Sequence, residues 1–179
     1  MMIKKKIMGH IEKYIDGINK KNKNCDWQIK KNEDENEVVI IGEEHFHKEK
    51  VDGEEWKLQR FIIEEIKPKY IVSERYKELI EEQMKGLKIE GVCFCDGIGD
   101  DEEIQGKKIK ECLGISERPV IALIGHIHAR EKSEIHKYCK NNNINYICIW
   151  NKKKVTKEDV FEREKEGERI SEEYGFQIK

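Results

Sequence analysis

The sequence contains no long apolar run and very little proline. Only two of its 179 residues are proline, Pro68 and Pro119. No stretch of about 18 consecutive apolar residues occurs, which excludes a membrane-spanning helix. The first residues, Met1 to Met8, contain too few apolar side chains for the centre of a signal peptide. We therefore expect a cytoplasmic protein without a membrane partner.

No charge of one sign predominates. Charged residues make up 40% of the chain, but 35 Lys and Arg nearly balance 37 Asp and Glu, which leaves a formal net charge of -2. A chain with balanced charge has no general electrostatic attraction to nucleic acid or to acidic membranes. We therefore expect no nucleic-acid partner.

The six cysteines lack the C-x-x-C spacing of zinc ribbons and thioredoxin-like redox motifs. They are Cys25, Cys93, Cys95, Cys112, Cys139 and Cys148. Free cysteine commonly behaves as a small apolar core residue, so we expect reduced and mostly buried thiols. Cys93 and Cys95 would share one face of a strand, which leaves a site for a soft metal as an alternative.

Short apolar runs rich in β-branched residues are the main feature that the sequence does contain. They cover residues 38–41, 70–73, 92–94, 120–124 and 146–150. Such runs are typical of strands that are buried on both faces of a parallel sheet.

Segments with helical periodicity separate these runs. Isoleucines at helical spacing predict a helix over residues 3–20. Asp52 and Glu55 stand at capping-box spacing before a second helix, and further helices are expected over residues 75–85 and up to about Lys140. Alternating strands and helices predict one α/β domain over residues 1–179, with a mainly parallel sheet flanked by helices in three layers. The charged segment 152–179 is expected to form a helix packed on this domain.

Acidic and imidazole side chains gather where three of the predicted strands end. Gly42 to His47 follow the first strand, Glu74 and Arg75 the second, and Gly125 to His128 the fourth. Ligands bind at the carboxyl ends of parallel strands, and glycine before a motif allows a close approach of the backbone. The sequence therefore predicts a functional site at this edge. His10 and His136 lie in helical segments and are interpreted as surface or packing residues.

These segments resemble three protein families. VVIIGEEHFHKE, followed by LQRFIIEEIKPKYIVSER, is similar to the opening of erythromycin esterases and ChaN-like haem-binding proteins, in which one strand ends in G-E-x-H and a later strand ends in Glu. TraB/TIKI metalloproteases have two G-x-x-H motifs, which here are Gly42 to His45 and Gly125 to His128. The similarity covers residues 38–135. The chain lacks room for the helical insertions of the esterases, so the resemblance does not identify the substrate.

The resemblance implies a hydrolase, either an esterase or a metal-dependent peptidase, that activates water at Glu43, His45, Glu74 and His128. His45, Glu74 and His128 could bind one divalent ion, such as zinc, manganese or cobalt, with Glu43 as the general base. Without metal, His45 would deprotonate water while Glu43 or Glu74 orients its ring. The expected substrate is a small molecule or a peptide.

Neighbouring residues are secondary candidates for the same site, namely Glu44, His47 and His126. Arg75 could hold an anionic substrate, although a surface ion pair is the simpler interpretation. The acidic loop 96–103 is interpreted as a solvated turn.

Two other functions fit parts of the sequence. Gly125 to His128 resembles the closing G-H-x-H motif of calcineurin-like metallophosphoesterases, but the D-x-H, G-D-x-x-D and G-N-H motifs of that family are absent. The alternative is a non-catalytic protein that binds haem or a metal, as the ChaN-like resemblance implies. In that case strand-end histidines would serve as ligands to the iron.

Overall fold

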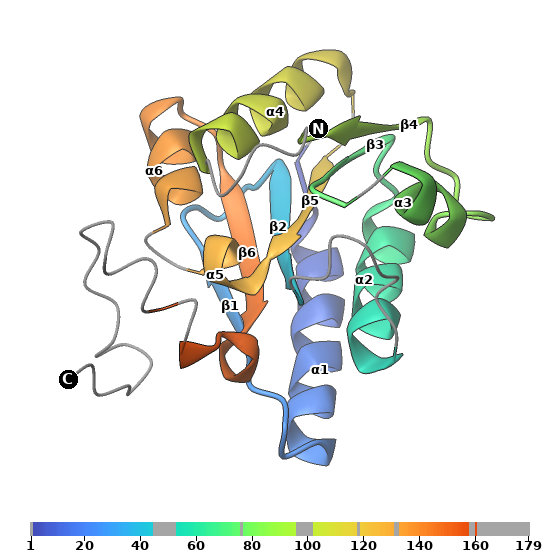
Figure 1. Cartoon of the computed structure of the whole chain (residues 1–179), viewed down its shortest axis with the longest axis vertical. Helices are drawn as coiled ribbons and strands as arrows, with labels where there is room; N and C mark the ends of the chain where they lie inside the picture. The colour runs from blue at the N-terminus through green and yellow to red at the C-terminus, as the bar shows by residue number, and fades with distance from the viewer. Residues whose placement is uncertain are drawn as a thin grey trace.

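The computed structural model describes residues 2–44, 53–75, 77–95, 102–117, 119–130, 133–157 and 160 (Figure 1). Its centre is a six-stranded sheet in the order β1-β6-β2-β5-β3-β4. The strands are β1 (Trp27–Lys31), β2 (Val38–Glu43), β3 (Tyr70–Ser73), β4 (Gly91–Phe94), β5 (Val120–Gly125) and β6 (Tyr146–Asn151). Only β1 is antiparallel to its neighbour, so the predicted mainly parallel sheet is confirmed.

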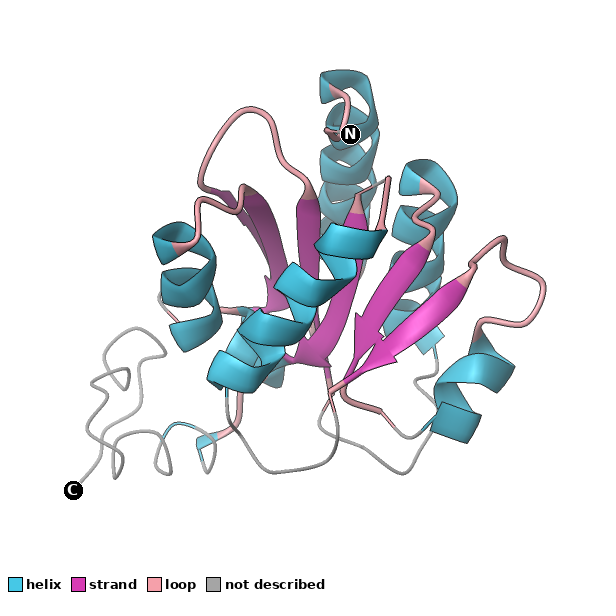
Figure 2. Ribbon diagram, turned by 90° about the horizontal axis from the view of Figure 1, so that it is seen from above, coloured by secondary structure: helices cyan, strands magenta, loops and turns pink. Residues whose placement is uncertain are grey.

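Helices cover both faces of the sheet. They are α1 (Lys5–Lys21), α2 (Gly53–Ile66), α3 (Lys77–Gln83), α4 (Glu102–Ile115), α5 (His126–Ala129) and α6 (Glu134–Asn141), with a 3-10 turn η1 (Lys152–Lys154). In Figure 2, α4 and α6 lie in front of the sheet and α1 and α2 lie behind it. The helix predicted over residues 3–20 corresponds to α1, and the one predicted over 75–85 corresponds to the shorter α3.

The alternation of side chains along β2 explains why the sheet needs two helical layers. Val39 and Ile41 belong to the core beneath α1 and α2, whereas Val38 and Ile40 belong to the core beneath α4 and α6. All four side chains are fully buried. Burial of each one contributes roughly 1.5–3 kcal/mol, so an apolar run of this kind is stable only between two layers.

The connections that leave β2 and β5 run in opposite directions across the sheet. From β2 the chain passes through α2 to β3, beyond β5, and from β5 it passes through α5 and α6 to β6, beyond β2. Adjacent strands whose connections diverge leave a crevice outside their carboxyl ends, where ligands bind in open α/β sheets. This switch point lies at Glu43 and Gly125, which are paired in register.

Four elements were not predicted from the sequence, namely β1, α4, α5 and η1. β1 is a mostly polar edge strand and shows no apolar run. Helix α4 includes residues 102–103, which were interpreted as part of the acidic loop, and the rest of that loop lies outside the described residues. Its apolar pattern is weak because Gly106 packs against Tyr138: a Cβ on Gly106 would lie 2.7 Å from the tyrosine ring.

The end of the chain is only partly described. The turn η1 and the buried Val155 and Val160 follow β6, and the rest of the predicted C-terminal helix lies outside the described residues. Within the part of the chain that the structure describes, no helix is both long and apolar enough to cross a membrane.

Candidate functional site

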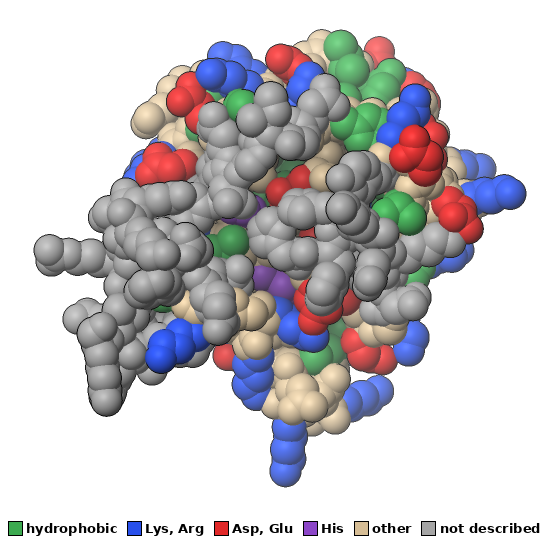
Figure 3. Space-filling view, in the orientation of Figure 1, with side chains coloured by type: hydrophobic (Ala, Val, Ile, Leu, Met, Phe, Trp, Pro, Cys, Tyr) green, Lys and Arg blue, Asp and Glu red, His purple; other side chains and the backbone are tan. Residues whose placement is uncertain are grey.

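Three strands deliver candidate residues to one edge of the sheet. Glu43 is the last residue of β2, Glu74 follows β3, and His126 and His128 lie in α5, which begins directly after β5. Because these strands are parallel, their carboxyl ends share one edge, as predicted. Figure 3 shows histidine and acidic side chains near the centre of this view of the molecule. His45 lies outside the described residues.

Glu43 and Arg75 form a buried ion pair. Each residue is only 3% exposed. Arg75 Nε donates to Glu43 Oε1 at 2.8 Å, and its Nη2 donates to Oε2, so the pair is bidentate. An ion pair of Arg75 was expected on the surface; the ion pair is present, but the surface location is wrong, because the guanidinium is buried in contact with side chains from α2 and α3.

Two glutamines complete the hydrogen bonds of this pair. Gln59 of α2 donates to Glu43 Oε2 at 3.1 Å and accepts from Arg75 Nη2 at 3.2 Å. Gln83 of α3 accepts from Arg75 Nη1. A buried ion pair is tolerated when its remaining donors and acceptors are satisfied, and these two amides supply additional hydrogen bonds to it.

Burial nevertheless dominates the protonation of Glu43. Removal from water is the largest influence on its carboxyl, whose pKa is raised overall from the ordinary 4.5 to about 7. The charge and hydrogen bonds of Arg75 lower this pKa, while the negative charges of Glu74 and Glu55 raise it. A carboxyl that titrates near neutral pH is typical of functional sites, although structural ion pairs can also produce it.

Glu74 connects the three elements around it. The backbone N–H of Gly125 donates to its Oε1, and Gln105 of α4 donates to its Oε2 at 2.9 Å. The carboxylate is half-buried. Since a carboxylate offers about four acceptor sites, these two bonds orient Glu74 and leave it able to accept a further hydrogen bond.

His126 forms a second buried pair with Glu55. The N–H of Asn151 donates to His126 Nδ1 at 3.2 Å, so the proton of the neutral ring is on Nε2. This Nε2 lies 3.5 Å from Glu55 Oε2, and the other oxygen of Glu55 accepts from the N–H of Glu44 at 2.8 Å. His126 Nδ1 therefore has a hydrogen-bond partner, whereas the buried Nε2 lies near Glu55 without forming a hydrogen bond.

The other candidates occupy different environments. His128 is fully buried in α5. Glu44 is half-buried and pairs with Lys154 of η1. His47 lies outside the described residues. Among the residues that the structure describes, no group of three or more His, Cys, Asp or Glu side chains is arranged to hold a metal ion. A metal site with Glu74 and His128 as ligands would need His45 as its third ligand, and His45 lies outside the described residues.

Sequence reasoning missed the polar residues that the helices contribute. Gln59 and Gln105 are almost completely buried, and each stands on the core-facing side of its helix. A polar side chain at an apolar position of the helical pattern was the available signal. Glu55 was noticed only as a possible helix cap.

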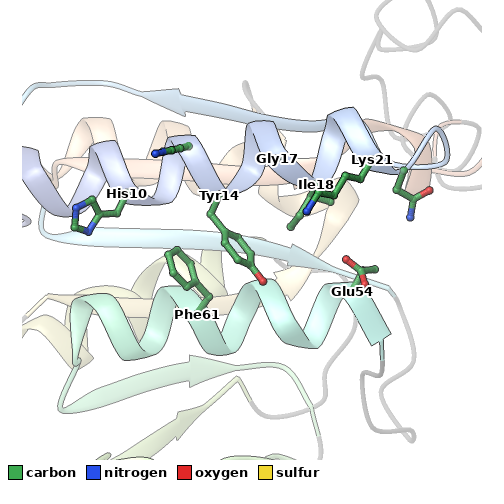
Figure 4. A pocket seen from close by; sticks show the side chains of 9 residues that line it. His10, Tyr14, Gly17, Ile18, Lys21, Glu54 and Phe61 are labelled. Atoms are coloured by element: carbon green, nitrogen blue, oxygen red, sulfur yellow. The ribbon is translucent and has the colours of Figure 1, made fainter.

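The two histidines that were assigned to surface or packing roles lie away from this edge. His10 is exposed and pairs with Glu65 at 3.0 Å. His136 is buried and stacks on Tyr146 with ring centroids 4.7 Å apart. His10 also lines a groove between α1 and α2, which contains none of the candidate site residues (Figure 4).

Comparisons of the chain with family models, with curated proteins and with solved structures gave no match. The fold and the site geometry are therefore the available basis for a functional proposal.

Proposed function

We propose that the protein is a hydrolase of the kind found among erythromycin esterases, ChaN-like proteins and TraB/TIKI proteins, with a small molecule or a peptide as substrate. The proposal rests on one observation: Glu43, Glu74 and the α5 histidines all follow or end strands at the edge of the sheet where the switch point between β2 and β5 lies. In open α/β sheets this is the place where ligands bind.

Within this proposal the described contacts favour Glu74 as the residue that takes the proton from water. Glu74 is half-buried, and the Gly125 N–H and Gln105 hold it in one orientation. Both oxygens of Glu43 accept hydrogen bonds from Arg75 or Gln59. To act as the base, Glu43 would first have to release one of these donors.

Glu43 instead supports the site electrostatically. Its ion pair with Arg75, the residue next to Glu74, connects the end of β2 to the end of β3. The negative charge of Glu74 in turn raises the pKa of Glu43. His45 and His128 remain in the proposal as the imidazole groups. A zinc, manganese or cobalt ion is the alternative arrangement, in which His45, Glu74 and His128 would be the ligands and Glu43 the general base, and metal analysis tests it.

Hydrolysis of a panel of ester and peptide substrates tests the proposal. The protein is assayed with and without each of the three metals, and its metal content and visible absorption are recorded, since absorption by bound haem would indicate the binding alternative. We expect Glu74→Gln to lose hydrolysis by about 100-fold or more, as for a general base.

The matched control is Glu81→Gln, which changes an exposed glutamate of α3 that lies 3.9 Å from Lys77. It should retain the wild-type rate. Absence of hydrolysis by the wild type under all metal conditions, or equal rates for Glu74→Gln and Glu81→Gln, would reject the proposal.

A further inference from the structure

Two cysteine thiols lie in direct contact on the α4 side of the sheet. Cys93 of β4 and Cys112 of α4 are 19 residues apart in sequence, and their Sγ atoms are 3.1 Å apart. The sulfurs of a disulfide are about 2.05 Å apart. A shift of about 1 Å therefore separates the thiol pair from bonding distance. The structure contains all six cysteines as free thiols, in agreement with the sequence expectation.

The two thiols differ in their access to solvent. Cys112 is fully buried, whereas Cys93 is half-buried. Burial raises the pKa of the Cys112 thiol, and the hydrogen bond and charge of Cys93 raise it further. Since the thiolate is the nucleophile in thiol chemistry, Cys93 is the sulfur that a dissolved reagent meets first, and Cys112 is placed to react second.

We propose that Cys93 and Cys112 are a redox-modification site, at which a small-molecule disulfide converts the two thiols into an intramolecular disulfide. The Cys93 thiolate attacks one sulfur of the reagent, breaks its S–S bond and releases one thiolate. Cys112 then loses its proton and attacks Cys93 Sγ, which displaces the second thiolate of the reagent. The protein loses two electrons and two protons, and the reagent is reduced to two thiols.

The bond would fix an edge of the sheet. β4 is the last strand of the sheet and pairs with β3 alone. A link from β4 to α4 would tie this strand to a helix that also carries Gln105, the hydrogen-bond donor to Glu74. Closure of a loop of this length restricts the unfolded chain, so we expect the melting temperature to rise by roughly 5–10 °C.

Oxidised glutathione is the probe for the test, because it supplies the required disulfide. The protein is incubated with an excess of the reagent, remaining thiols are alkylated, and digested peptides are analysed by mass spectrometry. We expect a peptide pair linked through Cys93 and Cys112 and without glutathione. Cys25 is also half-buried but packs in the core on the other face of the sheet, and it should retain any glutathione that it acquires.

Three variants separate this pathway from general thiol reactivity. Cys112→Ala should leave glutathione on Cys93, because the second attack is lost. Cys93→Ala should leave Cys112 unmodified, because the buried thiol has lost its exposed partner. Cys95→Ala is the matched control, since Cys95 lies close enough for its charge to act on Cys112, and it should form the same link as the wild type.

Other results would overturn the proposal. These are stable glutathione on Cys93 of the wild type, a link through Cys95 in place of Cys112, and a link that lowers the melting temperature, which would contradict the preformed contact. None of the measurements uses hydrolysis, so the test is independent of the proposed function.

Discussion

Gly42 of β2 lies directly against His126 of α5. A Cβ on Gly42 would lie 3.1 Å from both Cα and Cγ of His126, and closer still to Nδ1. This Nδ1 accepts the N–H of Asn151, so the absence of a side chain at Gly42 allows α5 to bind the end of β6. The glycine at the start of the first sequence motif therefore has a structural role, because it lets the end of β2 pack closely against α5.

Gly42→Ala should displace His126. The backbone of β2 is fixed by its pairing with β5 and β6, so the ring must move and lose its bond to Asn151. Overpacking of a buried site costs about 1–3 kcal/mol, and urea denaturation should show a loss of this size. An unchanged unfolding free energy would mean that α5 is not held by this contact.

The opposite effect is expected at Gly17 in α1. Nothing lies within 4 Å of a Cβ built on this residue, which borders the groove of Figure 4. Gly17→Ala should stabilise the protein by about 0.5–1 kcal/mol, because alanine loses less backbone entropy in a helix. Gly9 of α1 also has open space at its Cβ position, so Gly9→Ala should raise the unfolding free energy in the same way. Destabilisation by both variants in urea would contradict a continuous α1.

Removal of Arg75 tests the buried ion pair. Above pH 7, where the Glu43 carboxyl of the wild type is charged, Arg75→Met removes the cation of a buried pair, and such a loss costs about 3–5 kcal/mol. Arg60→Met is the control, because Arg60 pairs with Glu64 on the exposed face of α2 at 2.8 Å, and exposed pairs contribute about 0–1 kcal/mol. If urea denaturation shows a similar loss of unfolding free energy for both variants, the buried pair contributes no more to stability than the exposed pair.

The elements that could be predicted from the sequence are those whose buried residues form a recognisable pattern of apolar residues over a short stretch of the chain. β2 and β5 are buried on both faces and read as continuous apolar runs. β1 is an edge strand with mixed polar and apolar side chains, and α4 buries Gly106 and Gln105, which are not apolar core residues. Their burial depends on partners far away in the chain, which periodicity does not reveal.

The same reason limits prediction of the site. The strand-end position of Glu43 and Glu74 follows from parallel topology, so their common edge could be predicted. The Arg75 partner of Glu43 and the Gln105 partner of Glu74 could not, because they depend on how β3 and α4 pack against their neighbours.

Glu43 should give the stability of the protein a specific pH dependence. Its pKa in the folded protein is raised to about 7 from 4.5, so the folded state binds a proton more tightly than the unfolded chain. The resulting stabilisation is complete below about pH 4.5 and declines as pH rises to about 7. One pKa unit corresponds to about 1.4 kcal/mol, so a shift from 4.5 to about 7 makes the total decline at most roughly 3.5 kcal/mol.

Glu43→Gln isolates this contribution, because glutamine resembles the protonated carboxyl and does not titrate. The unfolding free energy of the wild type minus that of Glu43→Gln should fall between pH 5 and pH 7 and level off above it, since the folded and unfolded states then bind the same number of protons. Glu64→Gln on the exposed face of α2 is the control, and its difference from the wild type should show no such fall. A difference for Glu43→Gln that stays flat between pH 5 and pH 7 and rises with pH only below pH 5 would mean that attraction to Arg75 outweighs burial and keeps the carboxylate charged.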